Sequence, residues 1–449
     1  MSKNFSVLIN KKIKKFNKTV KIPSDKSCSI RSVLFASQCI GISNIKNLLE
    51  SDDVKVCINA LKALKVKIYK KKDIYKIYGN GLGSLKSNKK IKIFLGNSGT
   101  TARILSGLLA THPGKFYLYG DKSLNKRDMS RVFEPLKKIG ASFYPKEKKT
   151  LPITIEGTTM PLAQNHVENL GSAQVKSSLL TAFLNTPGSS TIEEKKISRN
   201  HTEILLKKIS ADIKVKKLKK GNLISLVGQK NLKAFNYKVD SDPSSAAFLI
   251  ALTLLTPNAK LTIHNCLCNE SRIGFYKILI NKGKANIKIK NLRKSPESGE
   301  LVGSIIVKSS SIKPINCPKQ LAPSLIDEFP ILFVIAALNK GTSSFQGINE
   351  ITKKESNRME EMRKILIQCG IHCKTTKDKM TIYGKNKINI KNKSILVKTK
   401  NDHRICMSSA ILGLVTGMKI KIKNFETVNT SFPSFMKLIR SLGGKIEVK

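Results

Sequence analysis

Residues 136–143 read Leu-Lys-Lys-Ile-Gly-Ala-Ser-Phe, and this phrase recurs along the 449-residue chain. An apolar-periodic segment, a small residue and then alternating apolar positions are typical of a helix that runs into a strand. Related phrases begin at Leu61, Leu206, Leu279, Leu366 and Ile439, and successive copies are 75, 70, 73, 87 and 73 residues apart. The sequence therefore predicts six copies of one α/β unit.

The six units are expected to gather into compact domains, because a unit of this size is too small to be stable alone. The midpoint by copy number lies between the third and fourth units. There, residues 236–245 form a polar, Pro-containing junction before a helix expected from Ala246. We predict a domain boundary at this junction, and the similar stretch Pro23–Ser27 indicates a second crossing.

A second informative stretch covers residues 95–105, Leu-Gly-Asn-Ser-Gly-Thr-Thr-Ala-Arg-Ile-Leu. It reads as a strand end, a turn of small residues and a helix. Asn97, Ser98 or Thr100 can cap that helix, whose free amides attract anions. Arg103 lies about one turn further on, where its planar fork suits a phosphate or a carboxylate. Taken alone, the stretch fits an ordinary capped turn equally well.

Similar polar helix starts recur once per repeat, and their recurrence favours a convergent oxyanion site over isolated caps. In the first half they are residues 23–31, residues 120–131 with Lys122, Lys126, Arg127 and Arg131, residues 171–178, and residues 198–203. The second half adds acids at Asp327-Glu328, in Lys354–Arg358 and in Asn401–Arg404. Such acids are usually helix caps, but they can serve as general acid and base if they face the basic residues.

The formal charge of +52 raises nucleic acid or an anionic membrane as a partner. Lys is spread through nearly every segment, however, so a global compositional bias explains the charge better than one binding surface. Arg is scarce by comparison, with 11 residues. Its placement at the polar helix starts therefore indicates a need for bidentate geometry, at Arg31, Arg103, Arg127, Arg199, Arg358 and Arg404.

The nine cysteines show no paired C-x-x-C spacing and lie mostly in apolar surroundings, which predicts reduced, buried thiols. The Cys369, His372 and Cys373 group is more typical of packing than of a metal site. The longest apolar runs are too short to span a bilayer, and the N-terminus lacks the apolar region of a signal peptide. A cytoplasmic protein is expected.

The order of these motifs resembles the 5-enolpyruvylshikimate-3-phosphate synthase family, from Asp25-Lys-Ser27 through Leu95–Thr100 to Asn401-Asp-His-Arg404. The resemblance covers essentially the whole length. It implies an α/β fold, a two-domain inside-out α/β barrel of six βαβαββ-type units, three per domain. Domain one would comprise residues 1–22 plus 241–449 and domain two residues 23–240. The active site would lie in the interdomain cleft.

The resemblance also implies which residues contact the substrates. Those expected to bind shikimate 3-phosphate are Lys26, Ser27, Arg31, Thr100, Ser172, Ala173, Gln174, Ser198, Arg199, Asp327 and Lys354. Those expected to bind phosphoenolpyruvate are Lys26, Gly99, Arg127, Gln174, Arg358 and Arg404. Two phosphates and two carboxylates require many fixed cations, which agrees with the placement of Arg.

In the implied mechanism, Asp327 takes the proton of the attacking 5-hydroxyl and Glu355 handles the proton at the methylene carbon. Lys26 assists as an acid or as an electrostatic stabiliser. No metal and no organic cofactor are implied, and a monomer is expected. The chain departs from the family pattern at Asn357, where Asp is frequent, and at Thr430, where many members carry Lys.

Two alternatives remain at this point. The sister enolpyruvyl transferases acting on UDP-N-acetylglucosamine share the fold, but they usually carry a Cys in the loop corresponding to residues 120–128, which has none here. A basic nucleic-acid-binding protein would bind any duplex tightly and with steep salt dependence. The shikimate-type reading predicts neither a specific nucleic-acid partner nor a membrane.

Overall fold

The computed structural model describes residues 4–85, 89–388 and 394–449. These residues form two compact units. Unit 1 comprises the described residues of Met1–Pro23, Ser241–Lys294 and Leu301–Lys449, and unit 2 comprises those of Ser24–Asp240 and Ser295–Glu300. The sequence offered no signal for the last segment, a six-residue excursion of the chain into unit 2.

Each unit contains three four-stranded sheets, and all six sheets have the same pattern. In each sheet one edge strand pairs in parallel with its neighbour, and the other two pairs are antiparallel. In the sheet β6-β7-β9-β8, for example, Ile91 of β6 (Ile91–Phe94) lies opposite Phe116 of β7 (Gly114–Tyr119). This repetition confirms the predicted six α/β units.

Unit 2 holds the sheets β14-β3-β5-β4, β6-β7-β9-β8 and β10-β11-β13-β12. Its other strands are β3 (Ile40–Lys46), β4 (Lys67–Lys71), β5 (Ile74–Asn80), β8 (Ser142–Tyr144), β9 (Ile153–Gly157), β10 (Asn165–Glu168), β11 (Ser189–Glu194), β12 (Asp212–Lys217), β13 (Asn222–Val227) and β14 (Asn236–Lys238). Its helices are α1 (Lys26–Ala36), α2 (Asp52–Ala63), α3 (Gly99–Ala110), η1 (Leu124–Lys126), α4 (Ser130–Ile139), α5 (Ala173–Phe183) and α6 (His201–Lys208).

Unit 1 holds the sheets β16-β17-β15-β2, β18-β19-β21-β20 and β22-β23-β1-β24. Its strands are β1 (Val7–Ile9), β2 (Asn17–Val20), β15 (Lys260–Leu267), β16 (Ile287–Lys294), β17 (Leu301–Lys308), β18 (Asn316–Cys317), β19 (Gly341–Gln346), β20 (His372–Thr375), β21 (Lys379–Gly384), β22 (Ser394–Lys398), β23 (Lys419–Lys423) and β24 (Glu447–Val448). Its helices are α7 (Pro243–Leu255), α8 (Gly274–Asn281), η2 (Lys319–Leu325), α9 (Phe329–Ala337), η3 (Asn349–Lys353), α10 (Arg358–Gln368), α11 (His403–Thr416), η4 (Phe425–Thr430) and α12 (Phe435–Ser441).

The chain exchanges strands between distant copies. β2, near the N-terminus, pairs in parallel with β15, and β14, which follows the third copy, pairs in parallel with β3. β1 completes the sheet of the last copy by pairing with β23 and β24. These three sheets therefore reach four strands only because the chain leaves unit 1 and later returns to it, whereas β6–β9, β10–β13 and β18–β21 each form a sheet from consecutive strands.

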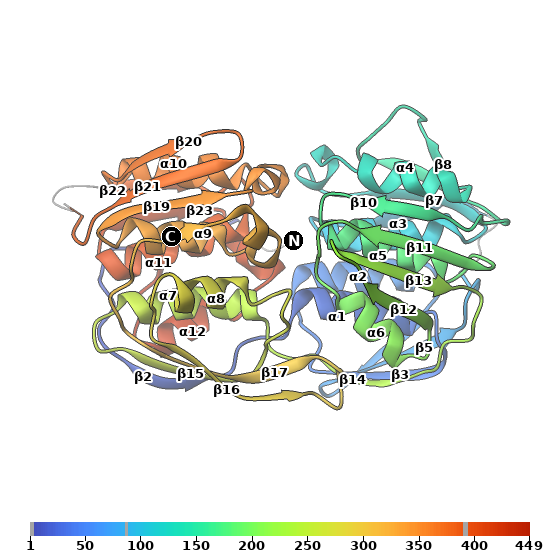
Figure 1. Cartoon of the computed structure of the whole chain (residues 1–449), viewed down its shortest axis with the longest axis horizontal. Helices are drawn as coiled ribbons and strands as arrows, with labels where there is room; N and C mark the ends of the chain where they lie inside the picture. Colours follow the sequence, from blue (N-terminus) through green and yellow to red (C-terminus); the bar gives the residue numbers. More distant parts are fainter. Residues whose placement is uncertain (1–3, 86–88, 389–393) are drawn as a thin grey trace. The chain divides into compact units, whose positions relative to one another are not determined.

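The first helix of each copy in unit 1 is buried almost completely, as a helix that is apolar all round must be. All nine residues of α9 are buried, as are residues 243–254 of α7 and 403–415 of α11. The sheets lie outside these helices (Figure 1). α7 begins three residues before the expected start at Ala246, because Asp242 caps it and Pro243 fits its first turn.

One to three residues after the second helix of every copy, a residue has a positive φ. These residues are Lys65, Gly140, Ser210, Lys284, Gly370 and Gly443. A left-handed residue here ends the helix and turns the chain into the next strand. This geometry explains the small residue in the recurrent phrase and shows that three copies keep it without glycine.

In the described part of the chain, no single helix is long and apolar enough to cross a membrane. The helices η2 and α9 taken together are long and apolar enough, but the chain bends by 114° between them. All nine cysteines are free and buried, in agreement with the predicted reduced thiols.

Candidate active site

The turn between β6 and α3 has the predicted strand-turn-helix form. Gly96 has a φ of +51°, and Ser98 is the cap of α3, accepting a hydrogen bond from the amide of Thr101 at 3.4 Å. Of the three caps that the sequence allowed, the structure therefore uses Ser98. This leaves the Thr100 side chain available for contacts outside the turn.

Gly99 lies between two guanidinium groups. A Cβ at this position would be 2.8 Å from Nη1 of Arg127 and 2.9 Å from Nη1 of Arg103. Arg127 also donates to Asn97 and, at 3.4 Å, to Ser123. Two cations that close to a bare backbone form an anion-binding corner at the start of α3.

Gln174 links this corner to the start of α5. Its side-chain oxygen accepts from Arg103 at 2.8 Å, and its nitrogen donates to Thr100 at 3.1 Å. Ser172 caps α5 by accepting from the amide of Val175, and Ala173 is the first helical residue. Thr100, Ala173 and Gln174 are thus brought together at adjoining helix ends, as the recurrent polar helix starts predicted.

Arg31 ties the start of α1 to α5 and α6. It is buried and donates to Ser177 at 2.9 Å and to Thr202 at 2.8 Å, both neutral oxygens. Within the described residues it forms no ion pair. Burial lowers its pKa and outweighs the nearby Cys28, Asp25 and Glu203, which raise it, while the charge of Arg199 lowers it further. A buried cation with neutral partners and a second cation nearby favours the binding of an anion.

Lys26 and Ser27 begin α1, which Asp25 caps by accepting from the amide of Cys28 at 2.7 Å. The ammonium of Lys26 lies 2.8 Å from a carboxylate oxygen of Asp53 at the start of α2. This ion pair therefore restricts the Lys26 side chain to a defined position. Asp53 was not predicted to take part.

Ser198 rests on a buried charge network that the sequence analysis did not identify. Its amide and hydroxyl both donate to Glu194. Lys176, with no exposed side-chain surface, lies 2.9 Å from Glu194 and 2.7 Å from Glu203. Lys176 stood inside the motif 171–178, but its burial beside two acids depends on where β11 and α6 pack.

In unit 1 the candidate catalytic acids surround Arg358. Its Nε lies 2.9 Å from Asp402, its Nη1 3.3 Å from Asp327 and its Nη2 2.5 Å from Glu355. Burial by itself lowers the pKa of Arg358, but the three carboxylates outweigh it and raise that pKa far above its ordinary value. The guanidinium thus fixes Asp327 and Glu355 relative to one another.

The two remaining predicted residues of unit 1, Lys354 and Arg404, lie just before α10 and in the first turn of α11. Lys354 is 3.9 Å from Asp327. Arg404 donates to the carbonyl of Ser244 at 3.2 Å and lies over the ring of Phe248. Asp402 caps α11, and Asn357 caps α10, so Asn fills the capping role at a position where Asp is frequent.

The predicted site residues thus lie in the first turns of helices or in the segments just before them, in two sets. Unit 2 holds Lys26, Ser27, Arg31, Gly99, Thr100, Arg127, Ser172, Ala173, Gln174, Ser198 and Arg199, and unit 1 holds Asp327, Lys354, Glu355, Arg358 and Arg404. The set in unit 2 is rich in cations and bare amides, and the set in unit 1 is rich in carboxylates. Anion binding and proton transfer are the chemistry that such groups support.

The fold is that of the enolpyruvyl transferases: the solved structure of the enolpyruvyl transferase NikO from Streptomyces tendae aligns over 100% of this chain and 99% of its own, with a TM-score of 0.76 at 10% identity. The chain belongs to the EPSP synthase (3-phosphoshikimate 1-carboxyvinyltransferase) family, whose model matches residues 10–439.

Individual relatives agree with this assignment. A 3-phosphoshikimate 1-carboxyvinyltransferase from Bartonella quintana is 39% identical over 95% of this chain and 96% of its own length. One from Paramagnetospirillum magneticum is 36% identical over 95% and 94%. The structure of EPSP synthase from Acinetobacter baumannii aligns over 99% of this chain and 100% of its own, with a TM-score of 0.84 and 35% identity.

Proposed function

We propose that this chain transfers the enolpyruvyl group of phosphoenolpyruvate to the 5-hydroxyl of shikimate 3-phosphate and releases phosphate, the reaction of the shikimate pathway for which its relatives are named. The observation that carries the proposal is the joining of three helix starts in unit 2. Arg31 bonds to Ser177 and Gln174 bonds to Thr100, so α1, α3 and α5 present their polar ends together.

This cationic set suits substrates that carry two phosphates and two carboxylates. We propose that Lys26, Ser27, Arg31, Thr100, Ser172, Ala173, Gln174, Ser198 and Arg199 bind shikimate 3-phosphate, together with Asp327 and Lys354. We propose that Lys26, Gly99, Arg127, Gln174, Arg358 and Arg404 bind phosphoenolpyruvate.

In the proposed mechanism, the 5-hydroxyl oxygen of shikimate 3-phosphate attacks the central carbon of phosphoenolpyruvate. A carboxylate oxygen of Asp327 accepts the hydroxyl proton as this bond forms. Glu355 delivers a proton to the methylene carbon, giving a tetrahedral adduct. Loss of phosphate, which takes up the proton held by Asp327, and return of a methyl proton to Glu355 regenerate the double bond and restore both acids. Lys26, held by Asp53, stabilises the charge that develops on the phosphate.

Arg358 has a special place in this scheme. All of its terminal nitrogens already have carboxylate partners, so an incoming carboxylate must share the guanidinium with Asp327 or Glu355. Binding of phosphoenolpyruvate would then loosen one catalytic acid from its ion pair. Asp327 or Glu355 would therefore leave its ion pair with Arg358, and become able to transfer a proton, only when phosphoenolpyruvate is bound.

The test is phosphate release by the purified full chain with phosphoenolpyruvate and shikimate 3-phosphate together. Release that requires both substrates supports the proposal. No release by a folded protein, or release with UDP-N-acetylglucosamine in place of shikimate 3-phosphate, contradicts it.

We further propose that the protein works as a cytoplasmic monomer without a specific nucleic-acid or membrane partner. Steep salt-dependent binding to duplex DNA would contradict that part.

A further inference from the structure

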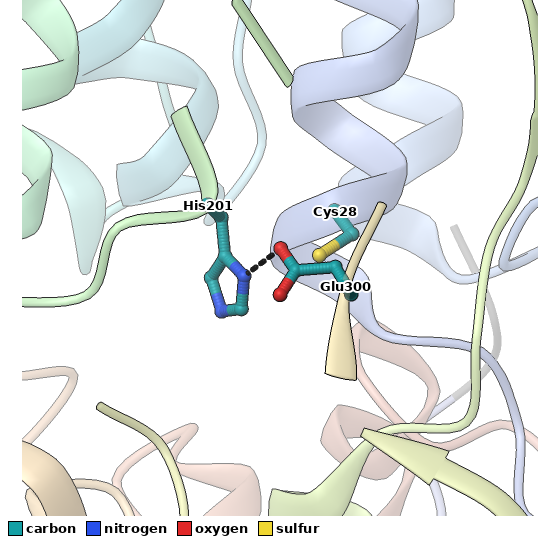
Figure 2. A group of neighbouring side chains, drawn as sticks. All are labelled: Cys28, His201 and Glu300. Atoms are coloured by element: carbon teal, nitrogen blue, oxygen red, sulfur yellow. Dashed lines mark hydrogen bonds and ion pairs between the residues drawn. The ribbon is translucent and has the colours of Figure 1, made fainter. Parts of the chain in front are cut away.

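A cluster of three buried side chains lies in unit 2 and has no role in the proposed reaction (Figure 2). Cys28 belongs to the first turn of α1, His201 begins α6, and Glu300 ends the segment 295–300. One donor atom from each of them, a sulfur, a ring nitrogen and a carboxylate oxygen, lies within 4.8 Å of the other two. The fold thus brings together three potential metal ligands that are far apart in sequence.

The ligands are anchored by contacts of their own backbone. The amide of Cys28 donates to Asp25 at 2.7 Å. The amide of Glu300 donates to Ser298 at 3.2 Å, and its carbonyl accepts from Ser295 at 2.8 Å. Because these bonds do not use the three donor atoms, the cluster is held in place before any ion arrives, which lowers the cost of binding.

The charges also suit a divalent cation. A thiolate, a neutral imidazole and a carboxylate together carry two negative charges, which one M²⁺ ion cancels. A neutral assembly is far less costly to bury than separate charges. Without metal, Nδ1 of His201 and Oε1 of Glu300 share a hydrogen bond of 2.6 Å, and an ion would replace the proton between them.

We propose that Cys28, His201 and Glu300 bind one transition-metal ion of the Zn²⁺ type. Sulfur, imidazole nitrogen and carboxylate oxygen are all ligands of Zn²⁺, and three protein ligands leave a fourth position for water. Binding releases the thiol proton, and the neutral imidazole of His201 binds through Nδ1 while it carries its proton on Nε2. The ion joins α1, α6 and residues 295–300, and so stabilises unit 2. The family resemblance implied no metal, and the nine cysteines showed no paired C-x-x-C spacing.

The experiment is a Co²⁺ titration of the full-length protein after removal of metals with a chelator. A thiolate-to-cobalt charge-transfer band in the near ultraviolet reports sulfur ligation, and intense visible bands report four-coordination. The expected result is saturation at one equivalent, reversal by Zn²⁺, and a raised midpoint of thermal unfolding with either metal. Absence of the charge-transfer band in the wild-type protein overturns the proposal.

Two variants separate ligand loss from misfolding. Cys28→Ser is expected to abolish the charge-transfer band. Glu300→Gln keeps an oxygen that accepts from His201, so it preserves the metal-free arrangement, but it is expected to weaken Co²⁺ binding about 100-fold. Cys39→Ser removes another buried thiol of unit 2 and serves as the matched control, with an unchanged titration. A band that survives Cys28→Ser or disappears in Cys39→Ser overturns the assignment, and so does a Co²⁺ affinity of Glu300→Gln equal to that of the wild type.

Discussion

Nη1 of Arg358 lies 3.3 Å from Oδ1 of Asp327, and the same guanidinium holds Glu355 and Asp402. Arg358 is only 1% exposed, whereas the side chains of Asp327 and Glu355 are 18% and 16% exposed. The guanidinium of Arg358 is therefore buried, and the two candidate catalytic acids are partly exposed to solvent. A buried guanidinium with three nitrogens in one plane can set this arrangement, and an ammonium cannot.

Arg358→Lys is therefore expected to destabilise the protein strongly. The lysine keeps the charge but cannot reach three carboxylates, which leaves at least one acid beside the buried site without its partner. We expect a loss of about 3 kcal/mol in the free energy of unfolding. Arg363→Lys is the matched control, because Arg363 pairs with Glu360 at the surface, and that change is expected to cost less than about 1 kcal/mol. Equal effects in urea unfolding would contradict this account.

Removing either proposed proton carrier is expected to reduce turnover without unfolding the protein. Asp327→Asn and Glu355→Gln keep the size of each side chain but lose the carboxylate, so kcat for phosphate release should fall about 10²- to 10⁴-fold. Glu360→Gln changes an acid of the same helix region whose partners are Arg363 and Lys364, and it should leave kcat unchanged. A variant of Asp327 or Glu355 with wild-type turnover would remove that residue from the mechanism.

Gly99→Ala is expected to weaken the binding of phosphoenolpyruvate. The new methyl would lie 2.8 Å from Arg127 and 2.9 Å from Arg103, so at least one guanidinium must move. We expect KM for phosphoenolpyruvate to rise about tenfold, equal to about 1.4 kcal/mol. The midpoint of thermal unfolding should not fall, because Ala is a good residue in the first helical turn. An unchanged KM would show that Arg127 and Arg103 adapt freely.

His112 should make the stability depend on pH. Burial lowers its pKa from 6.5 to about 4, and its Nδ1 donates to the carbonyl of Leu108 at 2.6 Å. Between these values the unfolded chain binds a proton that the folded chain does not, so stability falls as the pH drops from about 6.5 to 4. The shift corresponds to about 3 kcal/mol.

His112→Gln should flatten that part of the curve of unfolding free energy against pH. The exposed His372 provides the control, and His372→Gln should leave the slope as it is. The same steepness in the wild type and in His112→Gln would assign the acid sensitivity to other groups.

The left-handed helix ends give a pair of opposite predictions. Ser210 has a φ of +67° and is exposed, so Ser210→Gly should stabilise the protein by about 1 kcal/mol through relief of backbone strain. Gly140→Ala should destabilise it by a similar amount or more, because its φ is +116° and a Cβ would meet Thr158 at 3.1 Å. Thermal unfolding of both variants measures this, and effects of the same sign would contradict the explanation.

The repeated unit and the positions of the helix starts follow from local patterns in the sequence. The recurrent phrase ending at Phe143 predicted six α/β copies, because helix and strand periodicities are local properties. The polar helix starts, from Lys26 to Arg404, were visible because caps and bare amides depend on neighbouring residues only. The scarcity of Arg marked Arg31, Arg127 and Arg358, and each of these is buried in the structure.

The sequence by itself thus determined the repeated unit, the helix starts and the residue types at them. Tertiary structure alone decided which chain segments complete each sheet, as β2 and β14 show, because strand pairing across more than 190 residues leaves no local signal. It also decided that Asp402 joins Arg358, that Lys176 lies between two glutamates, and that Cys28 meets His201 and Glu300. Such contacts arise from burial of side chains that are distant in the sequence, and only the packed core fixes their partners.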